Sequence, residues 1–339
     1  MSPSISKGSG KLVAISKQYS LNNTELLEFY RMMRLIREFE GECQRQYVRG
    51  NIRGFLHVYS GEEAIAVGAI SAIRPEDYVV THYRDHGHAL AKGLSPNAVM
   101  AELFGKDTGC SRGKGGSMHL FDATKNFMGG YAIVGGHLPI ATGLALACRL
   151  KDEDRISLCF LGDGAVNEGE FHESMNLAAV WTLPVIFFCE NNLYGMGAKS
   201  STTLAVHEQI YKLAEAYGIP GRRVDGNDVI AVRNLTQELE QYVRSGNGPV
   251  FVEARTYRLQ GHSISDPANY RPQAEVEYWR SRDPIPRFQQ WLMAEGLATE
   301  EVIAQIDAEV ENEIIAAVEY AESSPFPESQ ELYNGVYHE

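Results

Sequence analysis

The stretch that decides the fold is ISLCFLGDGAVNEGEFHESMNLAAVWTLPVIFFCENNLYGMG, residues 156 to 197. It holds two short, largely apolar runs, 156–161 and 185–189, which are separated by enough chain for a helix. A third run of this kind covers 250–254. Short apolar runs that alternate with helix-length segments are typical of buried parallel strands. The pattern predicts an α/β fold with a parallel sheet flanked by helices.

Both predicted strands end in turns that carry polar groups. Gly162-Asp163-Gly164 follows the first strand, and Asn191-Asn192 follows the second. In open α/β sheets, ligands bind at the carboxyl edge of the strands, where both turns would lie. Small residues let backbone N–H groups approach an anion, and a helix start adds partial positive charge. We therefore expect an anion site at this edge.

The same two turns supply oxygen atoms for a metal ion. Asp163 offers a carboxylate, Asn192 an amide oxygen and Tyr194 a backbone carbonyl. Mg²⁺ takes about six oxygen ligands, so diphosphate oxygens and a water would complete the shell. The residues predict a Mg²⁺-diphosphate site, although two unrelated tight turns would give the same letters. The segment has no GxGxxG pattern, and the chain has no GxxxxGK[ST] pattern of nucleotide binders.

Gly-Asp-Gly, then the 26 residues 165 to 190, then Asn-Asn resembles the thiamine diphosphate signature. Four further stretches narrow the resemblance: GFLHVYSGEEA (54–64), THYRDHGHALAKG (81–93), RGKGGSMHLF (112–121) and EARTYRLQGHSISDP (253–267). Together they resemble the alpha subunits of thiamine-diphosphate-dependent 2-oxo acid dehydrogenases, from about residue 28 to the end. The expected fold is therefore the diphosphate-binding domain of thiamine enzymes, with helical extensions at both ends.

The resemblance assigns roles to particular residues. Tyr83 and Arg84 would hold the diphosphate, and a planar guanidinium suits phosphate oxygens. Asp163, Asn192 and Tyr194 would bind Mg²⁺. Ala132, Ile133 and Val134 match the stretch that supports the thiazolium ring, although the family commonly has glycine at position 132. The full set expected to bind the cofactor is Tyr83, Arg84, Ala132, Val134, Gly162, Asp163, Gly164, Ala165, Asn192, Tyr194 and His262.

The active-site histidines of the family correspond to His57 and His262. Thiamine chemistry needs proton donors beside the substrate carbonyl, and histidine suits this task. Five other histidines are expected to be structural or exposed: His82, His86, His88, His119 and His137. Ser263 matches a phosphorylated serine of the animal mitochondrial members, and Asn269 lies near a second such position. A phosphate at Ser263 would place negative charge beside His262.

The resemblance also implies partners. Thiamine enzymes need a glutamate from a second, pyrimidine-binding domain, and this chain has core for about one domain. We therefore expect a beta subunit in an α₂β₂ heterotetramer, with no activity from this chain alone. GKGGSMH and NNLYGMG resemble the pyruvate-acting members most. The expected reaction is oxidative decarboxylation of pyruvate with reductive acetylation of the lipoyl domain of dihydrolipoyl acetyltransferase.

Several alternatives stay open. Alpha subunits of acetoin and branched-chain 2-oxo acid dehydrogenases are the nearest, although acetoin enzymes usually diverge after Asn-Asn and branched-chain enzymes depart from GKGGSMH. The amino-terminal half of a split transketolase shares Gly-Asp-Gly but not GHSISDP. A scaffold that has lost catalysis is the non-enzymatic alternative, and the retained Asp163, Asn192, Arg84 and His262 argue against it.

Composition sets the remaining expectations. The 339 residues carry a net charge of −13, which opposes binding to nucleic acid or to anionic membranes. The five cysteines form no CxxC pair and are expected to be reduced. No apolar run is long enough to span a membrane. Residues 1–20 are expected to be a flexible tail, residues 21–339 a single domain, and the protein cytoplasmic. Amphipathic helices are expected over 24–48, capped by Asn23 or Thr24, and over 303–318.

Overall fold

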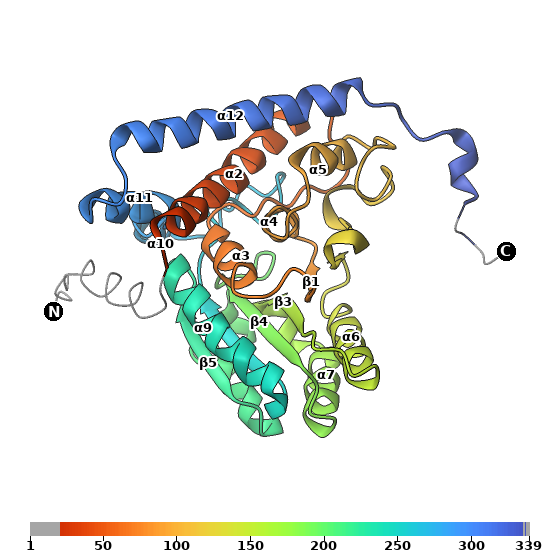
Figure 1. Cartoon of the computed structure of the whole chain (residues 1–339), viewed down its shortest axis with the longest axis vertical. Helices are drawn as coiled ribbons and strands as arrows, with labels where there is room; N and C mark the ends of the chain where they lie inside the picture. Colours follow the sequence, from red (N-terminus) through yellow and green to blue (C-terminus); the bar gives the residue numbers. More distant parts are fainter. Residues whose placement is uncertain (1–20, 335, 337–339) are drawn as a thin grey trace.

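A computed structural model describes residues 21–334 and 336, and its centre is one parallel sheet (Figure 1). The six strands of this sheet follow the order β2-β1-β3-β4-β6-β5, and every neighbouring pair is parallel. Their bounds are β1 Tyr78–His82, β2 Phe127–Tyr131, β3 Ser157–Gly162, β4 Val185–Asn191, β5 Gly221–Asp225 and β6 Val250–Arg255. The expected α/β fold with a flanked parallel sheet is confirmed.

Alternate residues of the central strands face two different hydrophobic cores. In β3, Leu158 and Phe160 pack into the core beneath α2, α3 and α9, whereas Cys159 and Leu161 pack beneath α6 and α7. A strand that is buried on both faces in this way is continuously apolar, as the sequence suggested. The helices are α2 Asn23–Val48, α3 Glu63–Ile70, α4 His86–Ala91, α5 Pro96–Leu103, α6 Leu138–Leu150, α7 Gly169–Val180, α8 Ser200–Thr203, α9 Val229–Tyr242, α10 Gln273–Arg280, α11 Pro284–Ala294 and α12 Glu300–Ser323.

The long helices α2 and α12 form the expected helical extensions and pack against each other (Figure 1). Arg34 of α2 pairs with Asp307 of α12, with 2.9 Å between Nε and Oδ1. The predicted cap of α2 was off by one or two residues. Asn22 is the N-cap, and it forms a reciprocal capping box with Glu25.

Three strands were not predicted. These strands are β1, β2 and β5. β2 reads FMGGY, and its glycines are required by close neighbours: a Cβ at Gly130 would lie 1.9 Å from Asp85 Oδ2. β5 is a polar edge strand with two exposed arginines. Neither strand has the apolar alternation from which strands are predicted.

The other expectations have mixed outcomes. All five cysteines are free. In the described part of the chain, no helix combines the length and apolarity that a membrane crossing requires. The flexible tail predicted for 1–20 lies outside the described residues, and the single domain over 21–339 stays a prediction.

Candidate functional site

A cavity of about 450 Å³ lies where the loops after β1, β2, β3, β4 and β6 meet the 54–64 segment. It opens at the carboxyl edge of the sheet, which is the predicted ligand edge. Every residue expected to bind the cofactor, the metal or the substrate lines it: His57, Tyr83, Arg84, Ala132, Val134, Gly162, Asp163, Gly164, Ala165, Asn192, Tyr194 and His262. The structure therefore brings the predicted set together in one cavity.

The first turn leaves its backbone open to the cavity. A Cβ at Gly162 or Gly164 would meet no atom within 4 Å, so space remains for a ligand against the main chain. The turn itself is a 3₁₀ segment, Asp163–Asn167, and α7 begins only at Gly169. Since an α-helix does not follow Gly-Asp-Gly directly, the expected anion site would depend on the N–H groups of the 3₁₀ turn more than on the dipole of α7.

Asp163 is a buried carboxyl group at this turn, with 2% of its surface exposed. Burial raises its pKa to about 6, although Arg258 opposes the shift. A raised pKa means that the chain alone compensates the negative charge poorly. A cation bound to this carboxylate would supply the missing counter-charge.

The loop after β4 presents the two other oxygen donors. Asn192 donates from Nδ2 to Glu62 Oε1 at 3.0 Å, which orients its amide oxygen. Leu193 between the two donors has φ of +74°, in the left-handed region that non-glycine residues seldom adopt. Its N–H group donates to Asn191 Oδ1 at 3.2 Å, which helps to hold this conformation. The strained residue sets the relative direction of the Asn192 side chain and the Tyr194 carbonyl.

Arg84 is buried and joins two distant segments. Its Nη1 donates to the carbonyl of Val58 and its Nη2 to the carbonyl of His262, both at 2.9 Å. Burial, followed by the positive charge of Arg258, lowers the pKa of Arg84. Each terminal nitrogen carries a second hydrogen, so this guanidinium can hold the loops and still donate into the cavity.

The two predicted catalytic histidines face each other across the cavity. The ring centroids of His57 and His262 lie 5.2 Å apart, and Tyr83 lies 4.7 Å from His57. Burial and the charge of Arg84 lower both histidine pKa values to about 3. The Nδ1 atoms of both rings are buried without a hydrogen-bond partner. These neutral imidazoles therefore have unused polar atoms beside the cavity.

The 132–134 stretch divides between cavity and surface. Ala132 and Val134 line the cavity, whereas Ile133 does not and is 74% exposed. The expected support of the thiazolium ring by this stretch remains a prediction for all three residues.

Sequence reasoning missed several residues of the site. Arg258 and Met196 line the cavity, as do His82 and His137, which were expected to be structural or exposed. His82 Nε2 pairs with Glu190 at 2.6 Å, and His137 Nε2 lies 2.7 Å from the Phe160 carbonyl, so both also have structural partners. Arg258 lies within the 253–267 motif, so its position in that motif was an available signal.

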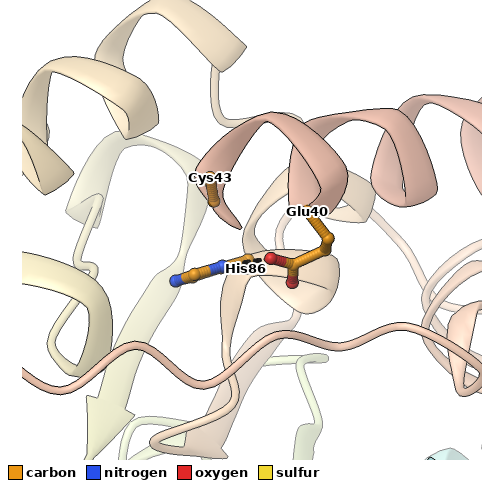
Figure 2. A group of neighbouring side chains, drawn as sticks. All are labelled: Glu40, Cys43 and His86. Carbon is orange, nitrogen blue, oxygen red and sulfur yellow. Dashed lines mark hydrogen bonds and ion pairs between the residues drawn. The ribbon is translucent and has the colours of Figure 1, made fainter. Parts of the chain in front are cut away.

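A second group of potential ligands, Glu40, Cys43 and His86, lies outside the cavity between α2 and α4 (Figure 2). His86 Nδ1 lies 2.8 Å from Glu40 Oε2, and its Nε2 lies 2.9 Å from Ser117 Oγ. The other Glu40 oxygen accepts from the N–H of Tyr59 at 2.7 Å. Thiol and imidazole are poor ligands for Mg²⁺, and the polar atoms already have partners. The cluster is best explained as a buried ion pair.

The fold and the cavity define a parallel α/β protein with a candidate ligand site at the carboxyl edge of its sheet. The family model described as the dehydrogenase E1 component matches residues 31–330, and the chain belongs to this family. It is 47% identical over 311 residues to the pyruvate dehydrogenase E1 component subunit alpha of Rhizobium meliloti (strain 1021), covering 91% of this chain and 89% of that protein. The proteins of the same name from Porphyra purpurea and Rickettsia typhi are each 43% identical over 322 residues, covering 93% and 95% of this chain and 93% and 98% of theirs. The family expected from the motifs is confirmed.

Proposed function

We propose that this chain is the alpha subunit of a pyruvate dehydrogenase E1 component, which decarboxylates pyruvate oxidatively and passes the acetyl group to a lipoyl domain. The main observation in support is that all the residues predicted to bind the cofactor, the metal or the substrate line one cavity. They come from segments separated by up to 205 residues (His57 to His262, 262 − 57). Relatives of nearly the same length that are named for this activity support the assignment.

The proposed cofactor is thiamine diphosphate with Mg²⁺. The open backbone at Gly162 and Gly164 leaves room for a diphosphate, and Asp163 lacks a full counter-charge. Asp163, Asn192 and the Tyr194 carbonyl would hold the metal, while Tyr83 and Arg84 would hold the diphosphate. When bound, the cofactor supplies the nucleophilic carbon and the electron sink that decarboxylation requires.

His57 and His262 would handle protons at the substrate carbonyl. Each ring is neutral at physiological pH and can donate one N–H hydrogen bond to a carbonyl oxygen as negative charge develops there. The free Nδ1 atoms provide the second position through which a proton can be accepted or delivered. Ser263 follows His262, and its Oγ lies 3.2 Å from Ser265 Oγ in an exposed pair, so we keep it as a candidate phosphorylation site.

A beta subunit would complete the site. Val134 lines the cavity and is 41% exposed, and the neighbouring helices α6 and α7 also present apolar side chains to solvent. The exposed set is Ile133, Ile140, Leu150, Leu177, Val180 and Trp181. Clusters of exposed apolar residues are typical of protein interfaces. This surface supports a partner that covers the cavity, in the proposed α₂β₂ assembly.

The test is reconstitution with a co-expressed beta subunit. Cofactor binding is followed by isothermal titration, and turnover is compared for pyruvate, 2-oxoisovalerate and acetoin. We expect turnover only in the mixture, with pyruvate preferred. Activity of this chain alone would overturn the divided site, and a preference for acetoin would reassign the substrate.

A matched pair of variants tests the proposed interface. Leu150 on α6 and Leu332 near the C-terminus are 77% and 75% exposed. Leu150→Asp should weaken association with the beta subunit about tenfold or more, because it buries a charge in an apolar contact. Leu332→Asp should leave association unchanged. Equal effects of the two substitutions would remove the α6–α7 surface from the proposal.

A further inference from the structure

Arg258 donates hydrogen bonds to both oxygens of the loop after β4 that are proposed as metal ligands, Asn192 Oδ1 and the Tyr194 carbonyl. Its side chain is 3% exposed, and its Nη1 donates to Asn192 Oδ1 at 3.1 Å and to the Tyr194 carbonyl at 3.0 Å. Its Nη2 donates to the Gly195 carbonyl at 3.3 Å. The two oxygens are the ones that the proposed Mg²⁺ would use. A single guanidinium group therefore contacts both of them.

The contact with Arg258 leaves Asn192 Oδ1 without a free lone pair for a metal ion. An amide oxygen has two lone pairs, and Asn192 Oδ1 already accepts from Arg258 and from the N–H of Tyr194, the latter at 3.3 Å. A metal ion needs one of these lone pairs. The bond from Tyr194 belongs to the loop backbone, so the side chain of Arg258 is the partner that can move away.

The positive charge of Arg258 also disfavours a metal ion at these oxygens. Mg²⁺ lies about 2.1 Å from its oxygen ligands, so an ion on these oxygens would be no more than roughly 5 Å from Arg258 Nη1. The site is buried, and solvent screens such a repulsion weakly. In the described part of the chain, Arg258 forms no ion pair with a carboxylate. The charge of Arg258 acts on the carboxyl groups of Asp163 and Glu62 only across space, so the guanidinium has no counter-ion in direct contact among the residues that the structure describes.

The backbone of Arg258 is fixed independently of its side chain. Arg271 Nη1 donates to the carbonyls of Arg258 and Gln260, both at 2.8 Å. The Arg271 guanidinium also lies over the ring of Tyr194, 5.4 Å from its centroid. A movement of the Arg258 guanidinium would thus leave the surrounding loop in place.

We propose that Arg258 occupies the oxygen donors of the metal site until a diphosphate draws the guanidinium away, so that metal and diphosphate bind as a pair. The inference rests on the proposed cofactor and deepens it. A diphosphate is a stronger partner for a guanidinium than the three neutral oxygens that Arg258 contacts, because its hydrogen bonds are charge-assisted. By linkage, the metal then strengthens diphosphate binding by the same factor.

The experiment measures Mn²⁺ binding to the reconstituted αβ complex by electron paramagnetic resonance, with and without thiamine diphosphate. For the unaltered complex we expect binding about 100-fold tighter with the cofactor. Arg258→Met removes the donors and the charge at similar volume. This substitution should tighten Mn²⁺ binding about tenfold in the absence of cofactor. The ratio between the Mn²⁺ affinities with and without cofactor should therefore fall by about the same factor.

Two further variants serve as controls for the effect of Arg258→Met. Arg255→Met alters an arginine three residues earlier that does not line the cavity, and it should leave both Mn²⁺ affinities unchanged. Arg258→Lys keeps the charge but cannot reproduce the forked contact, so its cofactor-free affinity should fall between those of the native and Met proteins.

Weaker or unchanged cofactor-free Mn²⁺ binding in Arg258→Met would overturn the inference, because Arg258 would then only orient the oxygens. Equal Mn²⁺ affinities with and without cofactor in the native complex would overturn it without any variant. Absence of Mn²⁺ binding even with the cofactor would instead remove the metal site and the proposed function.

Discussion

The cavity and the Glu40–Cys43–His86 cluster contain similar groups but use them differently. Both bring carboxyl and imidazole side chains together in the interior. In the cluster, Glu40 and His86 satisfy each other and nearby groups (Figure 2). In the cavity, both catalytic candidates, His57 and His262, keep a buried nitrogen without a partner. The difference indicates that unsatisfied polar atoms around open space mark a ligand site, whereas satisfied atoms mark a structural one.

The largest expected effect comes from removing a cavity imidazole. His262→Ala should lower kcat of the reconstituted complex by roughly 100- to 10,000-fold, the range typical of positioned acid–base groups. Cofactor affinity should change much less, because the His262 carbonyl that binds Arg84 is retained. Steady-state kinetics and cofactor titration separate the two quantities. His207→Ala, outside the cavity, is the control, and equal losses of kcat in both variants would contradict the assignment.

Asp163→Ala should have the next largest effect. Asp163 is the one ionisable group among the three proposed Mg²⁺ ligands, so its loss should weaken Mg²⁺-dependent cofactor binding on the order of 100- to 1,000-fold, as expected when one partner of a buried charge pair is removed. Calorimetry measures the change. The free energy of unfolding without metal should not fall, because burial already disfavours this carboxylate. Unchanged cofactor binding and activity would favour the scaffold alternative.

The cluster should show the opposite pattern, a loss of stability without a loss of chemistry. His86→Gln should lower the free energy of unfolding by about 3 kcal/mol, because it leaves the buried Glu40 carboxylate with a weaker partner. Burial opposes protonation of His86, but the charge of Glu40 prevails and raises its pKa.

The sign of the pH dependence follows from that shift. A folded pKa above the unfolded value near 6.5 gives stability that is fully present below pH 6.5 and is lost as pH rises through the folded pKa. The difference between native and His86→Gln proteins should therefore be larger at pH 6 than at pH 9. Urea unfolding at both values measures it, and a difference that grows with pH would rule out the ion pair.

Cys43→Ala should have the smallest effect. The thiol is fully buried, and truncation to alanine should cost about 1 kcal/mol through the small cavity left behind. Metal content and activity should not change, since the other two members of the cluster satisfy each other. Elemental analysis with thermal unfolding is the measurement. A stoichiometric metal lost from the variant would identify the cluster as a metal centre.

The part of the fold that was predicted is the part encoded locally. The apolar runs of β3, β4 and β6 and the turns that follow them are contiguous in sequence, so their place at one sheet edge could be predicted from strand direction alone. β2 could not, because its glycines respond to Asp85 and Phe121, which approach only after folding. Its amino-acid pattern is that of a loop.

The site was predictable to the same extent. Asp163 and Asn192 follow strand ends and could be identified by spacing and resemblance. The contact of Arg258 with Asn192 joins residues 66 apart, and no local pattern encodes it. Likewise, the double occupancy of Asn192 Oδ1 depends on side-chain geometry that sequence spacing does not contain. The residues of the site were thus largely predictable, but the bonds between them were not.

The hydrogen bonds of Arg84 also determine when the cavity can close during synthesis of the chain. Its guanidinium joins the carbonyls of Val58 and His262, so two walls of the cavity come from segments that lie far apart in the sequence. A nascent chain that extends through residue 194 contains every proposed cofactor-binding residue except His262, and it still lacks the segment that closes the cavity. Until translation has passed residue 262, the bond from Arg84 to the His262 carbonyl cannot form, so this wall of the cavity can close only after all six strands have been made.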